Sequence, residues 1–243
     1  MRVLSTVPFT ILRLLRDYIS LILLLIVPLL LITVFSFIFG NTTTENGGLI
    51  IDEQAVILTL AFQLFGGAIV MSYIHYDLFS ERKARMQVIP FNRSFYAFSL
   101  SLCGTVYSIM LGTILIIYSD LVLGVHWGSW LWSIFIVALM ALLSSIVCLI
   151  FMFSVNNIKI AERLSEVYGV GFIILAGLFF PMPDQPIFTF INDYVNPLSL
   201  SVAAIEQVRN GDIQGAWFPV SILFGAIVAT FIIMYFLGRR RFH

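Results

Sequence analysis

Residues 18–39 read YISLILLLIVPLLLITVFSFIF, a run of 22 residues with no charged side chain and no histidine. A helix needs about 20 residues, at about 1.5 Å each, to cross the ~30 Å hydrocarbon core of a bilayer. Five further stretches also lack charged residues and histidine: 54–73, 97–118, 129–153, 167–180 and 217–237. The sequence therefore predicts an all-α membrane protein with six transmembrane helices.

The overall composition agrees with this prediction. Hydrophobic residues make up 60% of the chain and charged residues 11%, whereas soluble proteins carry roughly 25% charged residues. No inner loop between the predicted spans is long enough to fold by itself, so residues 1–243 are expected to form a single transmembrane domain. Cys103 and Cys148 fall inside predicted spans, where small buried side chains are expected.

Basic residues are unevenly distributed over the segments that connect the predicted spans. If the N-terminus is cytoplasmic, the inner segments hold twelve of the thirteen basic residues and five of the thirteen acidic ones. The outer segments hold eight acidic residues and one basic residue, Arg209. Because positively charged loops remain in the cytoplasm, both termini are predicted to be cytoplasmic. The inner basic residues are Arg2, Arg13, Arg16, Arg82, Lys83, Arg85, Arg93, Lys159, Arg163, Arg239, Arg240 and Arg241.

Several classes of function lack the residues that their chemistry needs. The chain has no Gly-rich phosphate-binding loop and only two lysines, so it is not expected to bind a cofactor or hydrolyse ATP itself. The predicted spans contain no acidic or histidine relay for ion coupling, and the three histidines lack metal-ligand spacing. An enzyme is therefore disfavoured. A stand-alone channel or secondary transporter, an intramembrane enzyme and a membrane scaffold remain as alternatives.

Residues 1–17 have the pattern of a helix that lies in the membrane plane. Apolar side chains recur at spacings of three and four residues, and polar side chains, among them Arg13, Arg16 and Asp17, occupy the positions between. Such an interfacial helix turns its basic face toward anionic headgroups. The alternative is a frayed continuation of the first span.

Residues 77–90 combine a charged centre with large apolar side chains on either side. Leu78 and Phe79 precede the charges, Met86 and Ile89 follow them, and Pro90 ends the segment. A loop that only orients the chain needs positive charge but no large apolar residues. We therefore predict a short amphipathic helix that docks on a partner, with a plain loop as the alternative.

The stretch 167–180 is too short to cross a bilayer, at about 21 Å of helix. It contains three glycines and meets two prolines, so it is expected to enter the membrane partly and to bend. Residues 181–210 are then predicted to form an outer re-entrant segment of short helices before the last span. In the alternative, residues 161–166 extend the helix inward and complete an ordinary span.

Small and polar residues inside the predicted spans favour close helix packing. Gly66, Gly67 and Gly104 allow backbones to approach one another. Gln63 is the most polar side chain of the second span, so it is expected to face other helices or a cavity.

The order of these features resembles the permease subunit of an ATP-binding-cassette type-2 exporter over the whole chain. In that family the leader is an interfacial connecting helix, and a Glu-Arg segment is the coupling helix that sits in a groove of the ATPase. The matching elements are the amphipathic leader, Glu81-Arg82-Lys83 followed by Pro90, Asn156-Asn157, Gly177-Leu178-Phe179-Phe180-Pro181 and Asn196-Pro197-Leu198. Lys83-Ala84 departs from the family, which often has Glu-Gly or a similar small pair there.

The resemblance implies two functional regions. The outer re-entrant gate is bordered by Phe179, Phe180, Pro181, Asn196 and Pro197. The ATPase-coupling residues are Leu78, Phe79, Glu81, Arg82, Lys83, Arg85, Met86 and Ile89.

The resemblance also implies a function. The chain is expected to be a non-catalytic permease in a bacterial cytoplasmic membrane, paired with a second permease copy or homologue. Separate cytoplasmic ATPase subunits would bind ATP and Mg²⁺. No large outer domain is present, and the compact form is similar to bacterial antimicrobial-peptide and phenol-soluble-modulin exporters. Export of an amphipathic peptide or a lipid-like molecule is expected, with contact to membrane lipid and none to nucleic acid.

Overall fold

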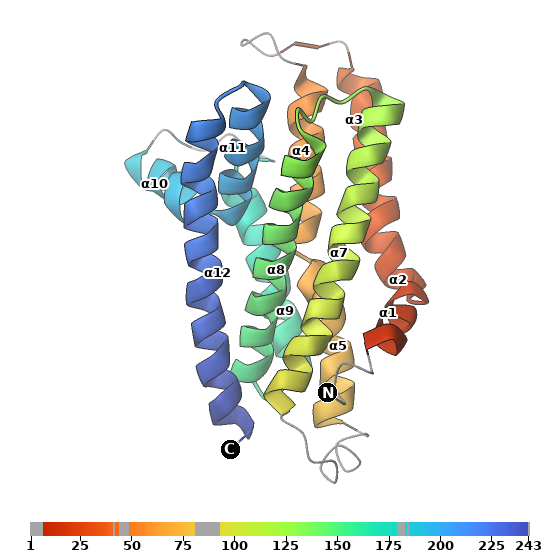
Figure 1. The fold of residues 1–243 in the computed structure, drawn as a ribbon, viewed down its shortest axis with the longest axis vertical. Helices are drawn as coiled ribbons and strands as arrows, with labels where there is room; N and C mark the ends of the chain where they lie inside the picture. Colours follow the sequence, from red (N-terminus) through yellow and green to blue (C-terminus); the bar gives the residue numbers. More distant parts are fainter. Residues whose placement is uncertain are drawn as a thin grey trace.

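The computed structural model describes residues 7–40, 42–43, 49–80, 93–178, 183 and 185–242. These residues are mostly helical, and the only β pairing among them is an isolated bridge between Thr43 and Leu49. Long helices run side by side along the molecule, and both chain termini lie at one end of the bundle (Figure 1). We call this end the terminal end and the opposite one the far end.

Five helical segments of the described chain are long and apolar enough to cross a membrane. Each overlaps one of the charge-free stretches and most extend beyond it, because long apolar runs satisfy their backbone polar groups within a helix. The five segments are Tyr18–Phe39, Ile50–Phe79, Phe95–Leu123, Trp130–Ser154 and Ile213–Arg241. The first comprises α2 (Tyr18–Leu21), η2 (Ile22–Ile26) and α3 (Val27–Phe39), and the second comprises α4 (Ile50–Gln63) and α5 (Gly66–Phe79). The other three correspond to α7 (Arg93–Leu123), α8 (Trp130–Ser154) and α12 (Ile213–Phe242).

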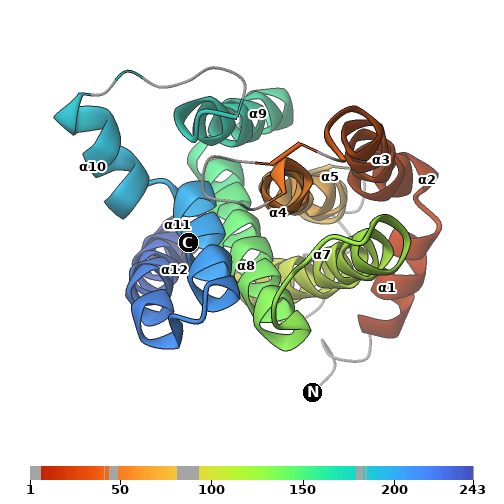
Figure 2. The ribbon, with the colours of Figure 1, turned by 90° about the horizontal axis from the view of Figure 1, so that it is seen from above.

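The centre of the bundle is α8, whose apolar side chains are largely buried among α5, α7 and α12. Seen from above, α4 and α5 lie between α9 on one side and α3 on the other (Figure 2). Ser144 and Ser145 of α8 lie against Gly67 of α5, and these small residues permit close approach of the two backbones.

The fifth apolar stretch belongs to a longer helix than its composition predicts. Helix α9 covers Ile158–Leu175, and its first turn is capped by the Asn157 side chain, whose oxygen accepts a hydrogen bond from the Lys159 N–H at 3.0 Å. Residues 161–166 are helical, so the structure agrees with the alternative in which they extend this helix inward. Its charged first turns explain why the helix is not among the five most apolar segments.

The leader contains a separate short helix, α1 (Val7–Leu15). Asp17 has a non-helical backbone and caps the next helix, α2 (Tyr18–Leu21), so α1 and the first long segment are distinct. Leu14 of α1 is fully buried, whereas Leu12 and Leu15 are exposed. One side of α1 therefore packs against the bundle, and the apolar side chains on its other side are exposed.

Two interruptions occur within the long segments. The first is η2 (Ile22–Ile26), a π-helical turn that directly precedes α3 (Val27–Phe39). Pro28, near the start of α3, has no backbone N–H that could donate to the preceding turn. The second interruption separates α4 (Ile50–Gln63) from α5 (Gly66–Phe79).

The break between α4 and α5 is stabilised by α8. The Ser144 hydroxyl donates to the Leu64 carbonyl at 2.6 Å, which supplies a bond that the interrupted helix lacks. Gly67 lies directly against the α8 backbone, because a Cβ built there would be 2.7 Å from the Ser144 carbonyl oxygen. The break therefore depends on tertiary packing and was not predicted.

Two short helices precede α12: α10 (Pro186–Tyr194) and α11 (Pro197–Arg209). Both lie toward the far end of the bundle (Figure 1). Helix α11 packs on α12, α8 and α4, whereas α10 has no buried residue.

Candidate functional site

A cluster of polar side chains at the terminal end joins α1 to α5 and α7. The Arg13 guanidinium lies 3.7 Å from the Asp77 carboxylate, and the Tyr96 hydroxyl donates to that carboxylate at 3.1 Å. The Asp77 side chain is only 5% exposed. A carboxylate buried to this extent needs such partners, because an unpaired buried charge is costly. Asp77 is therefore held from α1 and from α7 at the same time.

Tyr73 extends this cluster to the start of the first long segment. The Arg13 guanidinium lies over its ring, 4.1 Å from the centroid, in a cation–π contact. Its hydroxyl donates to the Asp17 carboxylate at 2.7 Å. The Ser20 hydroxyl donates to the same carboxylate at 2.7 Å. We refer to Arg13, Asp17, Tyr73, Asp77 and Tyr96 together as the terminal polar cluster.

Asp17 is anionic in this cluster. Partial burial raises the pKa of its carboxyl group, but the hydrogen bonds from Ser20 and Tyr73 outweigh burial and leave the pKa below its ordinary value. Asp17 thus combines the N-cap of α2 with a bond to α5.

Of the predicted coupling residues, Leu78 and Phe79 lie within the part of the chain that the structure describes. Leu78 and Phe79 form the last turn of α5 rather than the start of a separate helix. Leu78 is 4% exposed and packs in the core, whereas Phe79 lies 5.5 Å under the Arg241 guanidinium of α12. Arg241 also donates to the Val155 carbonyl at 3.1 Å. Residues Glu81, Arg82, Lys83, Arg85, Met86 and Ile89 lie outside the described residues.

Of the leader residues, Arg13 and Asp17 enter the terminal polar cluster, whereas Arg16 is exposed. Sequence reasoning did not select Tyr73 or Tyr96. Tyr73 stands one helical turn before Asp77, which was a usable signal for a shared face. No sequence spacing indicated that either residue would meet Arg13.

Asn196 organises the far end. Its side-chain oxygen accepts from the Leu198 N–H at 3.0 Å and caps α11, with Pro197 in the first turn. Its amide group donates to the Phe172 carbonyl of α9 and to the Asn192 side chain, both at 3.0 Å. Asn196 is fully buried, so it joins α9, α10 and α11 at one point. The other predicted gate residues, Phe179, Phe180 and Pro181, lie outside the described residues.

Acidic residues at the far end differ in their surroundings. The Asp52 carboxylate of α4 accepts from the His126 backbone N–H at 3.0 Å. Burial raises the pKa of the Glu206 carboxyl group on α11, Arg209 at 3.9 Å opposes this shift, and the nearby Glu53 adds to it. Arg209 is the only basic residue that the described chain places at the far end.

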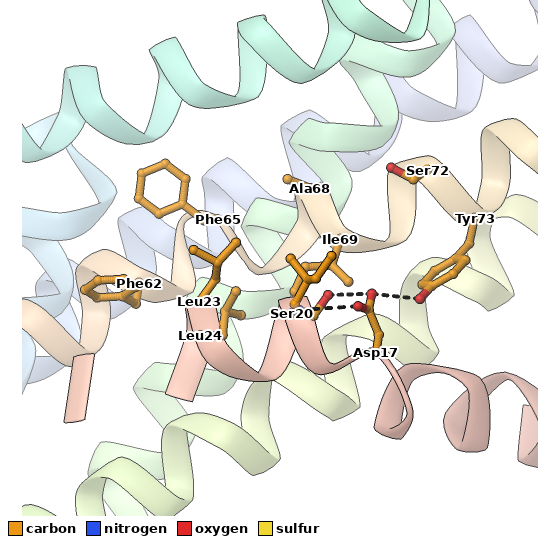
Figure 3. Close-up of a pocket in the computed structure, with 11 residues that line it drawn as sticks. Asp17, Ser20, Leu23, Leu24, Phe62, Phe65, Ala68, Ile69, Ser72 and Tyr73 are labelled. Atoms are coloured by element: carbon orange, nitrogen blue, oxygen red, sulfur yellow. Dashed lines mark hydrogen bonds between the residues drawn. The ribbon is translucent and has the colours of Figure 1, made fainter. Parts of the chain in front are cut away.

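A pocket of about 540 Å³ lies between the first long segment and α5 (Figure 3). Polar side chains, including Asp17 and Tyr73 of the terminal polar cluster, gather at one end of it. Aliphatic and aromatic side chains form the rest. The pocket is lined by Asp17, Ile19, Ser20, Leu23, Leu24, Phe62, Phe65, Ala68, Ile69, Ser72 and Tyr73.

The fold and this site define a class: a polytopic α-helical membrane protein with a cluster of polar contacts at each end of the bundle. A family model for the ABC-2 type transporter matches residues 4–208. The chain belongs to this family, as its motifs predicted. Curated proteins gave no significant match to the sequence.

Family membership establishes the general role of the chain. It is an integral membrane protein and the permease component of a transporter. ATP hydrolysis lies in a separate ATP-binding-cassette subunit with which the permease associates.

Proposed function

We propose that this chain is the non-catalytic permease of an ATP-driven exporter and that residues 77–90 transmit movement from the ATPase. The observation that carries this proposal is the terminal polar cluster. It connects the last turns of α5, which lead directly into residues 81–92, with α1 and α7. A push on the coupling segment therefore reaches the leader and two long helices through the same few contacts.

The charge distribution supports a topology of six spans with both termini in the cytoplasm. The first turns of α9, with Lys159 and Arg163, and the last turns of α12, with Arg239, lie toward the terminal end, whereas α11 ends with Arg209 toward the far end (Figure 1). Positively charged ends face the cytoplasm. Helix α9 is the remaining span, because its 18 residues give about 27 Å of helix.

The outer re-entrant segment comprises α10 and α11. The buried Asn196 holds the start of α11 against the last turns of α9. Helix α10 carries exposed Ile187 and Phe190 beside polar side chains, a composition suited to a membrane interface.

The working assembly contains a second permease copy or homologue and cytoplasmic ATPase subunits that bind ATP and Mg²⁺. Its setting is a bacterial cytoplasmic membrane, and its substrate is an amphipathic peptide or a lipid-like molecule. Closure of the ATPase moves α5 together with α1. The break at Leu64 and Phe65 lets the inner half of this segment pivot relative to α4.

Charge reversal in the coupling segment tests the proposal. The triple change Arg82→Glu, Lys83→Glu and Arg85→Glu is expected to reduce substrate-stimulated ATPase activity at least about tenfold, because docking contacts between charged groups are each worth roughly 1–3 kcal/mol when desolvated. The measurement uses the permease and its ATPase reconstituted in liposomes.

A matched control is Arg163→Glu, which reverses an exposed charge on α9 at the same end of the bundle. It is expected to leave stimulated activity within about twofold. Normal coupling in the triple variant, or substrate flux through the permease without nucleotide, would refute the proposed mechanism.

A further inference from the structure

We infer that the pocket between η2 and α5 binds a cationic amphipath, a molecule with an ammonium head and an alkyl chain. This inference rests on the proposed function and specifies its substrate class. The volume of about 540 Å³ lies within the roughly 300–1,000 Å³ of ordinary small-molecule sites. An ammonium group would sit at the polar end and the alkyl chain along the apolar walls (Figure 3).

The polar end carries negative charge that no ion pair neutralises within the described chain. The hydrogen bonds to the Asp17 carboxylate come from Ser20 and Tyr73, which are neutral groups. Arg13, which lies over the Tyr73 ring, makes its ion pair with Asp77 instead. A bound ammonium group supplies the missing positive charge.

A second carboxylate lies beside the same end. The Ser72 hydroxyl, which lines the pocket, donates to the Glu162 side chain of α9 at 3.2 Å. The adjacent Arg163 forms its ion pair with Glu166 and interacts only weakly with Glu162. Two carboxylates near one end favour a cation and disfavour an anionic ligand of the same shape.

The remaining walls suit an alkyl chain. Leu24, Phe62 and Phe65 line the end of the pocket away from Asp17, and Ile69 lies between them and the polar end (Figure 3). Leu23 is 53% exposed at the bundle surface, so a molecule dissolved in the membrane can enter from the side. Leu23 and Leu24 also belong to the π-helical turn, a form of helix frequent at functional sites.

Photolabelling tests the inference directly. The assembled transporter in nanodiscs of zwitterionic lipid is exposed to photoreactive probes with the same twelve-carbon chain and an ammonium, a sulfate or a hydroxyl head. The ammonium probe is expected to label residues 18–24 and 62–73, as located by mass spectrometry. Unlabelled dodecyltrimethylammonium should compete with it, whereas dodecyl sulfate should not. Equal labelling by the sulfate probe, or labelling elsewhere only, overturns the inference.

Asp17→Asn tests the charge selectivity of the site. The variant is expected to reduce the preference for the ammonium probe over the hydroxyl probe roughly tenfold, since one charge-assisted contact is lost. This ratio does not depend on the fraction of folded protein. The control Asp193→Asn removes an exposed carboxylate on α10, outside the pocket, and should leave the ratio unchanged.

A second variant tests the pocket without changing Asp17, which caps α2. Ala68→Phe fills the apolar part of the pocket without touching Asp17, and it should abolish labelling by both the ammonium and the hydroxyl probes. An unchanged ratio in Asp17→Asn, or retained labelling in Ala68→Phe, contradicts the site.

The two proposals fail in different ways. If ATPase coupling is normal but the probes show no charge preference, the pocket assignment is wrong and the exporter proposal stands. If the preference is present but the coupling variants behave as wild type, the pocket stands and the coupling mechanism is wrong.

Discussion

At the scale of single residues, the buried charges of this protein are held by specific partners. Asp77 is nearly inaccessible and depends on Arg13 and Tyr96, whereas the Arg13 side chain is 38% exposed. The two partners are therefore not equivalent. Water can solvate Arg13 when Asp77 is removed, but it cannot reach Asp77 when Arg13 is removed.

Arg13→Ala is accordingly expected to be more destabilising than Asp77→Asn. We expect about 2 kcal/mol for Arg13→Ala, because it leaves a buried carboxylate unpaired, and about 1 kcal/mol for Asp77→Asn. Thermal unfolding of the complex in detergent measures both. The double variant serves as the control: its loss should be smaller than the sum of the two, and strict additivity would show that the pair does not interact.

Glu206 provides a prediction about pH. Because burial raises its pKa in the folded protein, ionisation of Glu206 opposes folding, so its contribution to stability is present at low pH and is lost as pH rises through the folded-state pKa. Glu206→Gln removes this effect. The variant should gain up to about 1 kcal/mol over the wild type at pH 8, discounted for partial exposure, and nothing at pH 4. A stability difference that does not change between these pH values would contradict the assignment.

At the scale of helices, two contacts decide how neighbouring elements meet. One is the packing of Gly67 against the α8 backbone at the α4–α5 break. The other is Asn196, which joins the last turns of α9 to the start of α11. Gly67 permits the close contact with α8 because it has no Cβ. Asn196 joins its two helices because its short amide side chain reaches both the Leu198 N–H and the Phe172 carbonyl.

Gly67→Ala is expected to separate α5 from α8. The added methyl group would be 2.7 Å from a carbonyl oxygen and 2.8 Å from a Cα atom of α8, so backbone must move. We expect a loss of about 2–3 kcal/mol in thermal unfolding. Gly171→Ala is the matched control, because a Cβ there meets nothing within 4 Å and Ala favours a helix. Equal effects of the two changes would argue against the close contact.

Asn196→Ala removes the cap of α11 and both amide donations. We expect a loss of about 2–3 kcal/mol, since a cap and a buried carbonyl partner are lost together. Asn196→Asp keeps the cap acceptor but cannot donate to Phe172, so it separates the two roles. Protease sensitivity around α10 and α11 should increase in Asn196→Ala. If both variants unfold at the wild-type temperature, Asn196 does not organise this end.

At the scale of the whole molecule, charge is divided between the two ends of the bundle. Arg209 lies at the far end, and the other described basic side chains lie toward the end with the termini. This charge distribution predicts the orientation of the chain in the membrane, which cysteine labelling can test directly. Asp212→Cys lies at the far end and Ser80→Cys at the terminal end, and both native cysteines are buried.

In intact cells, a membrane-impermeant maleimide is expected to label Asp212→Cys at least about tenfold faster than Ser80→Cys. Opening the cells should make the two rates similar, which controls for intrinsic reactivity. Faster labelling of Ser80→Cys in intact cells would reverse the topology and exclude cytoplasmic docking of residues 77–90.

Much of the architecture could be predicted from local sequence. Charge-free runs of about 20 residues indicated the five long segments, because a helix satisfies its own backbone polar groups in lipid and needs about this length to cross. The motif order identified the family. The inward extension of α9 through residues 161–166 was predicted only as an alternative, because the charged side chains there lower the hydropathy of the stretch without breaking the helix. The capping of that helix by Asn157 depends on backbone geometry.

The sequence by itself determined the helical class, the likeness of the motifs to the family and the asymmetry of charge, since these follow from apolar run length and the order of residues along one chain. Only the tertiary structure decided that Arg13 meets Asp77 and Tyr73, that Ser144 supports the α4–α5 break and that a pocket lies beside Asp17. These contacts join residues more than fifty positions apart. Their partners are chosen by how the helices pack, and spacing along the chain carries no information about that choice.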